Sequence, residues 1–206
     1  MINEDTIETQ IIANATDLFL TKGFKSVTMD DLASSLGMSK KTIYSYFETK
    51  NLLVNAVTDY LFDIISTGIN YIRSQNYNSI EELFLVNDFV QKHLKNENSS
   101  PLYQLQKYYP KIHSQLIKKQ FEVTTQCVID NLEKGIEEGL YRKSLNKEFI
   151  SRIYFSLIVG IKDQEMFPKE VFPVKATVTN FLDYHIHGIT NAKGLKILEQ
   201  IQQTRK

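Results

Sequence analysis

Cysteine is nearly missing from the 206-residue sequence, in which Cys127 stands alone. A single cysteine excludes a disulfide bond within the chain and suits a reducing compartment, and we interpret it as a small buried apolar residue rather than a redox sensor. The longest apolar run, IYFSLIVGI at 153–161, has about half of the roughly 20 residues that span a bilayer. The acidic N-terminus is unlike a signal peptide. We therefore expect a cytoplasmic protein with no membrane partner.

Neither sign of charge is in excess, because 24 lysines and arginines face 24 acidic residues. Catalytic signatures are also missing: there is no His–Glu–x–x–His pattern, no glycine-rich phosphate loop and no nucleophile elbow. His185 and His187 are two residues apart, so a helix places them on different sides, which disfavours a shared metal. We expect no enzyme activity, no metal site and no cofactor.

The segment 28–50, TMDDLASSLGMSKKTIYSYFETK, reads as two short helices joined by a glycine turn. Thr28 is placed to cap the first helix, and two aspartates follow it where the helix dipole favours negative charge. Leu32 and Leu36, four residues apart, give this helix one apolar side. Gly37 then supplies the positive φ that the turn requires.

The second helix of the segment has an inner and an outer side. Ser39 caps its start, and Ile43 and Phe47, again four residues apart, are assigned to the core. The outer side and edges are polar and aromatic: Lys40, Lys41, Thr42, Tyr44 and Tyr46. This layout is how a helix-turn-helix protein places one helix in the DNA major groove and braces it on phosphates.

A further helix is predicted before this pair, over residues 5–22. Ile7, Ile11, Ala15 and Leu18 mark one of its faces, and a glycine at position 23 ends it. Three helices in the first 48 residues therefore form a small head that contains the helix-turn-helix.

Residues 11–53 resemble the N-terminal domain of the TetR/AcrR family of transcriptional regulators. The most specific parts are the patterns LF..KGF..VTM.DLA..LGMS and TIYSYFETK, which ends at Lys50. The resemblance implies an all-α homodimer with a DNA-binding domain at 1–48 and a helical ligand-binding and dimerisation domain at 49–206. It implies a repressor that a small ligand releases from a palindromic operator in double-stranded DNA.

The resemblance also assigns roles to residues of the head. Lys40, Lys41 and Thr42 match the positions that reach base edges, and Tyr44 and Tyr46 match aromatic positions that contact the sugar–phosphate backbone. The full set of DNA-binding residues is Thr28, Ser39, Lys40, Lys41, Thr42, Tyr44, Ser45, Tyr46 and Lys50. Among these, Thr28 and Lys50 match phosphate anchors at helix N-termini.

The head departs from the family pattern in its charge. Residues 1–50 contain five lysines, no arginine and seven acids, a net charge of −2. Because non-specific affinity scales with the phosphates neutralised, we expect it to be weak, so that specific binding needs two heads together. The low charge also leaves open an alternative, a helical small-molecule-binding or interaction module that no longer binds DNA.

Beyond residue 50 the helical period continues. Helices are predicted over about 50–75, 79–95, 101–109, 110–139, 146–166, 174–188 and 191–203, with a polar turn at 96–101. The two helices of the pair at 146–166 and 174–188 are apolar on more than one side, which favours a four-helix interface between two copies of the chain. The predicted dimer residues are Ile150, Ile153, Leu157, Ile161, Val178, Phe181, Leu182 and His185. The alternative is that this pair is simply the central core.

Aromatic residues are frequent in the predicted body and could line an apolar ligand cavity. The predicted pocket residues are Phe62, Phe84, Phe89, Tyr103, Tyr108, Phe121 and Tyr154. The sequence lacks a cluster of arginines, which would favour a phosphorylated or dicarboxylate ligand. We therefore expect an apolar or amphipathic ligand. The alternative is that these rings are ordinary core. The sequence identifies neither the ligand nor the operator.

Overall fold

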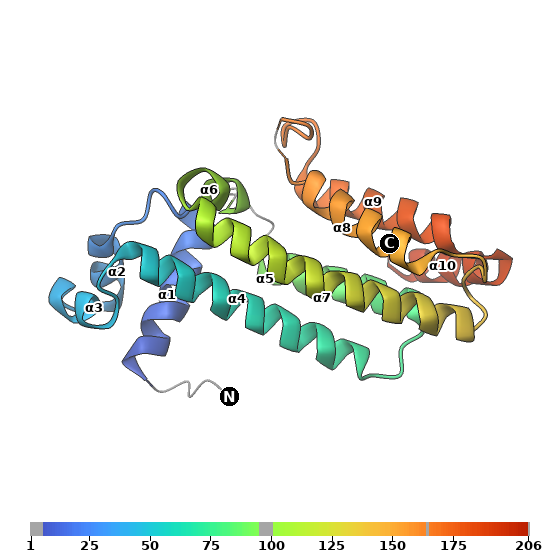
Figure 1. The fold of residues 1–206 in the computed structure, drawn as a ribbon, viewed down its shortest axis with the longest axis horizontal. Coiled ribbons are helices and arrows are strands. Elements are labelled where there is room, and N and C mark those ends of the chain that lie inside the picture. The colour runs from blue at the N-terminus through green and yellow to red at the C-terminus, as the bar shows by residue number, and fades with distance from the viewer. Residues whose placement is uncertain (1–5, 95–100, 164, 206) are drawn as a thin grey trace. The chain divides into compact units, whose positions relative to one another are not determined.

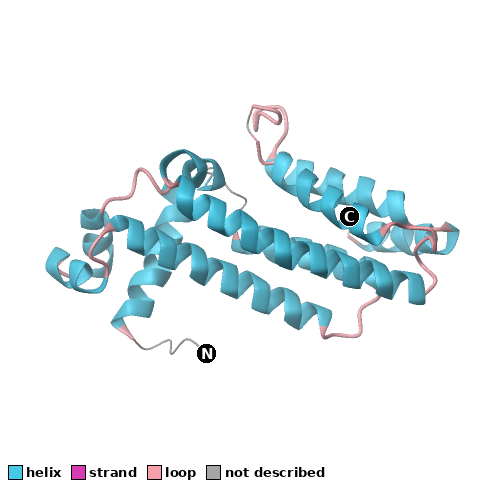
Figure 2. Ribbon diagram, in the orientation of Figure 1, coloured by secondary structure: helices cyan, strands magenta, loops and turns pink. Residues whose placement is uncertain are grey.

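The computed structural model describes residues 6–94, 101–163 and 165–205. The predicted all-α fold is confirmed: the described residues form helices and no strand, with one isolated bridge between Tyr141 and Thr190 (Figure 2). Residues 96–100 of the predicted polar turn lie outside the described residues.

The helices begin and end close to the positions that the sequence predicts (Figure 1). They are α1 (Ile7–Lys22), α2 (Met29–Leu36), α3 (Lys40–Tyr46), α4 (Lys50–Arg73), α5 (Ser79–His93), α6 (Pro101–Tyr108), α7 (Pro110–Glu137), α8 (Lys147–Gly160), α9 (Val174–Ile189) and α10 (Ala192–Thr204). The largest difference is α8, which ends at Gly160 rather than near residue 166. Beyond it, the carboxylate of Asp163 accepts a hydrogen bond from the backbone N–H of Glu165 at 2.8 Å. This local turn competes with a longer helix.

The chain divides into two compact units. The first comprises residues 1–65 and 94–118, and the second comprises residues 66–93 and 119–206. Helices α4 and α7 each begin in the first unit and end in the second. The first compact unit is therefore larger than the predicted head of residues 1–48, because it also contains part of α4, α6 and the start of α7. A functional boundary at residue 48 stays a prediction.

The core of the first compact unit is apolar. Its buried members are Ile11, Ala15, Phe19, Phe24, Val27, Met29, Leu32, Ala33, Ile43, Phe47, Leu53, Val54, Val57 and Leu105. Leu105 comes from α6, so this helix is part of the same core. Gly23 has a φ of 89°, and a Cβ at this position would overlap the side chain of Gln104 on α6. The loop after α1 thus needs glycine both for its backbone and for its contact with α6.

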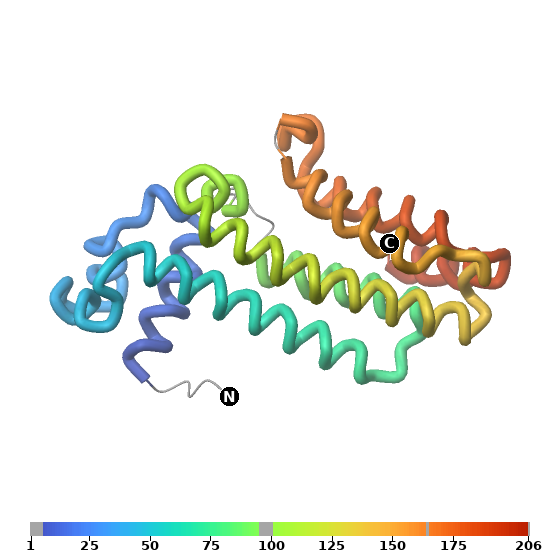
Figure 3. Tube along the Cα trace, viewed as in Figure 1, coloured from blue at the N-terminus to red at the C-terminus, as the bar shows by residue number. Residues whose placement is uncertain are grey.

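The core of the second compact unit joins α5, α7, α9 and α10, with α8 running beside α9 (Figure 3). Its buried apolar members are Ile80, Leu83, Phe84, Val128, Leu132, Leu140, Tyr141, Leu182, Ile186, Ile189 and Leu198. The Tyr141 ring lies against Gly135, where an added Cβ would overlap it. The close contact lets a large aromatic side chain fill the space beside α7.

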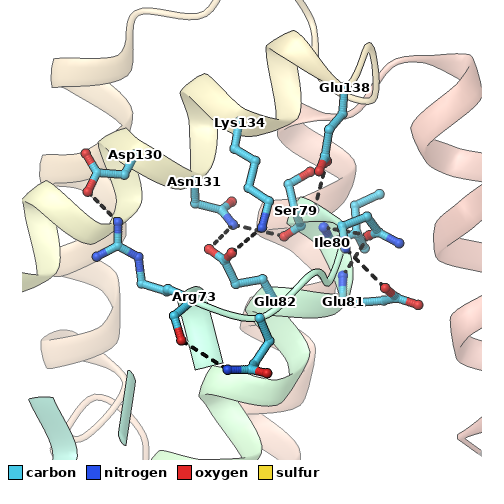
Figure 4. A network of polar contacts seen from close by, with 12 residues as sticks. Arg73, Ser79, Ile80, Glu81, Glu82, Asp130, Asn131, Lys134 and Glu138 are labelled. Carbon is cyan, nitrogen blue, oxygen red and sulfur yellow. Dashed lines mark hydrogen bonds and ion pairs between the residues drawn. The ribbon is translucent and has the colours of Figure 1, made fainter. Parts of the chain in front are cut away.

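A polar network lies inside this second core (Figure 4). The carboxylate of Glu82, 4% exposed, accepts hydrogen bonds from Asn131 Nδ2 at 2.9 Å and from Lys134 Nζ at 2.7 Å. Asn131 Nδ2 also donates to the Ser79 carbonyl at 2.9 Å, and Tyr141 donates to Asn131 Oδ1 at 3.1 Å. Burial raises the pKa of the Tyr141 hydroxyl, which keeps it a neutral donor. Asn131 is thus bonded to three partners.

The C-terminal end of α4 is tied to α7 by Arg73. Its guanidinium forms an ion pair with Asp130 and donates to Cys127 Sγ at 3.5 Å. Cys127 is half-buried, and burial is the main cause that raises the pKa of its thiol. The residue is therefore less buried than predicted, and it accepts a hydrogen bond.

Among the described helices, α4 alone is long and apolar enough to cross a membrane by length and composition. Core helices of soluble proteins pass the same test. Leu53, Val54 and Val57 of α4 are buried in the first core, and Asp59 and Asp63 interrupt its apolar sequence. Packing of its first half against the helix-turn-helix accounts for these buried apolar residues.

Candidate nucleic-acid interface

Thr28 caps α2 as the sequence predicts. Its Oγ1 accepts from the Asp31 N–H at 3.1 Å, while the Asp31 carboxylate accepts from the Thr28 N–H at 2.8 Å and from the Thr28 hydroxyl at 2.7 Å. The backbone hydrogen bond from Thr28 is the largest cause that lowers the pKa of Asp31. A phosphate would have to displace Asp31 to receive either hydrogen bond from Thr28. The first role of Thr28 is therefore to fix the start of α2.

The turn between α2 and α3 confirms the roles given to Gly37 and Ser39. Gly37 has a left-handed φ of 63°, and nothing lies near the place of a Cβ, so the backbone alone demands glycine. The Met38 N–H donates to the Ala33 carbonyl at 3.0 Å and closes the end of α2. Ser39 Oγ accepts from the Thr42 N–H at 3.0 Å and caps α3. The start of α3 is thus fixed by local bonds.

The inner and outer sides of α3 also agree with the prediction. Ile43 and Phe47 are buried in the first core. Lys40, Lys41, Tyr44, Ser45 and Tyr46 are exposed, and Thr42 is half-buried. A short helix with a fixed apolar side thus presents two tyrosines, two lysines and hydroxyl groups outward.

The two lysines at the start of α3 differ in their surroundings. Lys40 Nζ pairs with the Asp30 carboxylate at 2.9 Å, and this hydrogen bond raises the pKa of Lys40. Lys41 is exposed and has no ion pair among the described residues. Sequence reasoning treated the two lysines alike and missed Asp30. Lys41 is the better placed of the two to reach a base, because its charge is not already paired.

Lys50, at the start of α4, is half-buried. Its Nζ donates to the Lys25 carbonyl at 3.3 Å and lies 5.8 Å from the centroid of the Phe19 ring. Burial lowers the pKa of Lys50, and the charge of Lys25 lowers it further. The structure thus brings the charges of Lys25 and Lys50 together at this helix N-terminus.

The predicted pocket residues are divided between the compact units. Phe62, Tyr103 and Tyr108 belong to the first; Phe84, Phe89, Phe121 and Tyr154 belong to the second. Within the second unit the rings form separate contacts: Phe121 meets Phe155 at 5.2 Å, and Tyr154 meets His185 at 4.8 Å between centroids. Phe84 is a buried member of the second core. A ligand pocket lined by these seven residues stays a prediction.

The predicted dimer residues of α9 are buried within the chain itself. Val178, Phe181, Leu182 and His185 are 2–9% exposed, because this side of α9 packs within its own compact unit. Burial lowers the pKa of His185 to about 4. A dimer interface that includes these four α9 residues stays a prediction.

The outer surface of α8 is different. Ile153 is 43% and Leu157 is 38% exposed, while Ile150 and Ile161 are half-buried. Phe149 on α8 and Tyr184 on α9, absent from the predicted set, are more exposed still, at 61% and 73%. Phe149 lies four residues before Ile153 and eight before Leu157 on the same helix, and this spacing was the signal that could have identified the outer face of α8.

Residues 11–57 match the family described as "Bacterial regulatory proteins, tetR family". The chain is also 24% identical over 185 residues to the HTH-type transcriptional regulator YvaF of Bacillus subtilis, covering 89% of this chain and 96% of that protein. The N-terminal part of the chain therefore matches the TetR family, and the relatives support a TetR-family regulator. The chain is a transcriptional regulator with an N-terminal helix-turn-helix.

Other transcriptional regulators match part of the chain or its fold. Over 75 residues it is 31% identical to IcaR of Staphylococcus aureus, described as a negative transcriptional regulator of the biofilm operon icaADBC; the match covers 36% of this chain and 40% of IcaR. A transcriptional regulator from Cytophaga hutchinsonii has the same fold, with a TM-score of 0.72, 18% identity and coverage of 88% and 97%. Regulators of the TetR family bind DNA and small-molecule ligands and form dimers.

Proposed function

We propose that the chain is a homodimeric, ligand-responsive repressor that inserts α3 into the major groove of a palindromic operator. The observation that supports this most is the two-sided character of α3. Ile43 and Phe47 fix its inner side in the core, and Lys41, Tyr44 and Tyr46 are exposed on the other side. To read base edges in the major groove, a protein needs a rigid helix with exposed hydrogen-bond donors.

Each exposed side chain of α3 receives a role in this proposal. Lys41 donates to guanine O6 or N7, because its ammonium is not paired. Tyr44 and Tyr46 donate their hydroxyl hydrogens to phosphate oxygens and pack on sugars, which fixes the register of the helix. Lys40 contributes less charge than Lys41, since Asp30 neutralises it. Thr42 and Ser45 add short-range hydrogen bonds.

Dimerisation is proposed through the outer faces of α8 and α9. Phe149, Ile153 and Leu157 form an exposed apolar stripe on α8, and Tyr184 is exposed on α9. Two such helix pairs related by a two-fold axis make a four-helix interface. A palindromic operator requires two heads about one DNA turn, roughly 34 Å, apart. Pairing supplies the affinity that a head of net charge −2 lacks.

Ligand control is proposed to be a shift between two arrangements of the dimer. An apolar or amphipathic ligand that prefers the arrangement unsuited to the operator removes the protein from DNA. Reversing a 99:1 population takes roughly a 10⁴-fold preference for one state. The protein performs no catalysis in this proposal and acts in the cytoplasm.

The test is selection of DNA by the purified protein from a random-sequence duplex library, followed by affinity measurements on the enriched site. Wild type should enrich a palindrome, and Lys41→Ala or Tyr44→Ala should each weaken binding roughly 100-fold, since every dimer loses two contacts of about 1–3 kcal/mol each. Tyr71→Ala, an exposed tyrosine at the other end of α4, is the matched control and should bind normally.

A second function is favoured by one specific observation, the pairing of Lys40 with Asp30 on a head that is already acidic. In that case the chain is a helical small-molecule-binding or interaction module without DNA affinity. Failure of wild type to enrich any sequence would support this function and contradict the first.

A further inference from the structure

The first compact unit holds more positive charge than its helix-turn-helix. Residues 1–50 contain five lysines and seven acids, whereas residues 101–118 contain three lysines and no acid. Both segments belong to the first compact unit. Helix α6 and the start of α7 therefore add positive charge to the first compact unit, whereas residues 1–50 have a net negative charge.

Helix α6 is held against the loop that joins α1 to α2 (Figure 1). The Lys25 N–H donates to Gln104 Oε1 at 2.9 Å, and the Phe24 ring meets the Tyr109 ring at 6.4 Å between centroids. Leu105 of α6 is buried in the same core. These contacts fix the position of α6 relative to the loop, so side chains from both can act as one surface.

Lysines and tyrosines alternate on that surface. Lys25 Nζ lies 5.0 Å and Lys107 Nζ lies 5.6 Å from the centroid of the Tyr108 ring, and Lys107 Nζ is 5.8 Å from the Tyr103 ring. Tyr103 and Tyr108 are 46% and 42% exposed. Each ammonium is thus held over an aromatic ring that solvent still reaches.

The same surface continues to the start of α4. Lys50 Nζ donates to the Lys25 carbonyl at 3.3 Å, so Lys50, Lys25 and Lys107 follow one another. We name Lys25, Lys50, Tyr103, Lys107 and Tyr108 the lysine–tyrosine surface. In the described part of the chain, no carboxylate forms an ion pair with any of its three lysines. Asp31 attracts Lys50 without forming an ion pair with it. Gathering three cations with so little compensation is unfavourable unless an anion binds them.

We propose that the lysine–tyrosine surface binds the sugar–phosphate backbone of DNA that flanks the half-site read by α3. The inference rests on the proposed function. The lysine–tyrosine surface begins close to α3 in the chain. Helix α3 ends at Tyr46, and α4 begins at Lys50, which is the first lysine of the surface. Ammonium groups and tyrosine hydroxyls both bond to phosphate oxygens without reading sequence. The surface therefore adds affinity and length to the contact, and leaves specificity to α3.

The expected signature is a dependence on flanking DNA and on salt. Each dimer carries two copies of Lys25 and of Lys107, which makes four further cations. Each phosphate contact contributes about 0.9 to the slope of log affinity against log salt, so loss of four contacts lowers the slope by about 3.6. Contacts confined to α3 would show no such dependence on flanking DNA.

The experiment compares wild type with Lys25→Gln/Lys107→Gln on the duplex enriched from the random library. One duplex contains only the palindrome, and a second carries about eight more base pairs on each side, which spans most of a further helical turn. Wild type should bind the longer duplex about 10-fold or more tightly than the shorter one. The variant should bind both alike, with wild-type affinity for the short duplex and the smaller salt slope. Thermal unfolding should give the same midpoint temperature for the variant and wild type, which shows that the variant is folded.

The matched control is Lys143→Gln/Lys196→Gln, which removes two exposed lysines from the second compact unit and should behave as wild type. If Lys25→Gln/Lys107→Gln keeps the full dependence on duplex length and salt, the lysine–tyrosine surface does not contact DNA. If wild type enriches no duplex and binds neither length, the proposed function fails and this inference fails with it.

Discussion

The first compact unit buries almost only apolar side chains, whereas the second buries a carboxylate, an amide and an imidazole. Among the described residues of the first unit, the buried polar ones are Thr16 and Thr58, whose hydroxyls donate to carbonyls of their own helices at 2.7 and 2.8 Å. In the second, Glu82, Asn131 and His185 lie among apolar neighbours.

The two compact units thus differ in where they place charged side chains, on the surface in the first and also in the core in the second. In the helix-turn-helix, the charged groups lie on the surface, so the residues proposed to contact DNA can be changed without disturbing the core. In the second compact unit, charge is built into the packing of α5 against α7, and its loss leaves unsatisfied groups inside. We therefore expect substitutions to affect binding in the first unit and stability in the second.

The largest effect is predicted for Asn131→Leu. The change removes the donor to Glu82 and Ser79 and the acceptor for Tyr141. It should lower the free energy of unfolding by about 3–5 kcal/mol, because a buried carboxylate loses a partner and other polar groups are left unpaired.

Urea unfolding followed by circular dichroism measures this loss. Asn180→Leu, on the exposed side of α9, is the matched control and should change stability by no more than about 0.5 kcal/mol. Equal effects of the two substitutions would show that the network in Figure 4 does not hold the second core together.

The second prediction concerns acid. His185 is buried against Tyr154 and Phe181, and burial lowers its pKa from 6.5 to about 4. The folded protein then binds this proton more weakly than the unfolded chain. The stabilising contribution is present above pH 6.5 and is lost as the pH falls toward 4, at a total of about 3 kcal/mol.

Unfolding free energies at pH 7.5 and 4.5 check this prediction. His185→Leu should reduce the difference between the two values. Asn180→Leu, which replaces an exposed residue that does not titrate on the same helix, should leave the difference unchanged. If the pH dependence of stability were the same in His185→Leu as in wild type, the buried His185 would not be its source.

The helix-turn-helix was the part of the structure most completely predictable from sequence. Thr28, Gly37 and Ser39 carry signals that depend only on the local backbone, and the spacing of Ile43 and Phe47 identifies a face of one helix. These features are confirmed in the structure. Periodicity likewise predicted the other helices and most of their ends.

The rest depends on contacts that spacing does not encode. Asp30 and Lys40 are ten residues apart and meet only because the glycine turn brings α2 and α3 together. The buried side of α9 and the outer side of α8 are both apolar, so sequence alone does not distinguish a side covered by the chain itself from one free for a second copy. Contacts between α6 and the loop after α1 join residues 79 positions apart.

The smallest effect is predicted for the cap of α2. Thr28→Ala removes the side-chain acceptor for the Asp31 N–H and should lower the free energy of unfolding by about 1 kcal/mol. Thr28→Ser keeps a hydroxyl and should restore most of the loss. Urea unfolding of the three proteins under one condition makes the comparison, and a serine variant as unstable as the alanine variant would argue against capping.

Pairing of the two heads is the central claim, and Leu157→Glu tests it most directly. A carboxylate on the exposed stripe of α8 should separate the dimer, because an unpaired charge does not tolerate burial in an interface. Tyr71→Glu, at an exposed position of α4, is the matched control. Analytical ultracentrifugation and affinity for the enriched palindrome are measured on the same samples. We predict a folded monomer whose affinity falls roughly 100-fold or more, since one head then binds one half-site. A folded monomer that binds the palindrome as tightly as wild type would contradict the account.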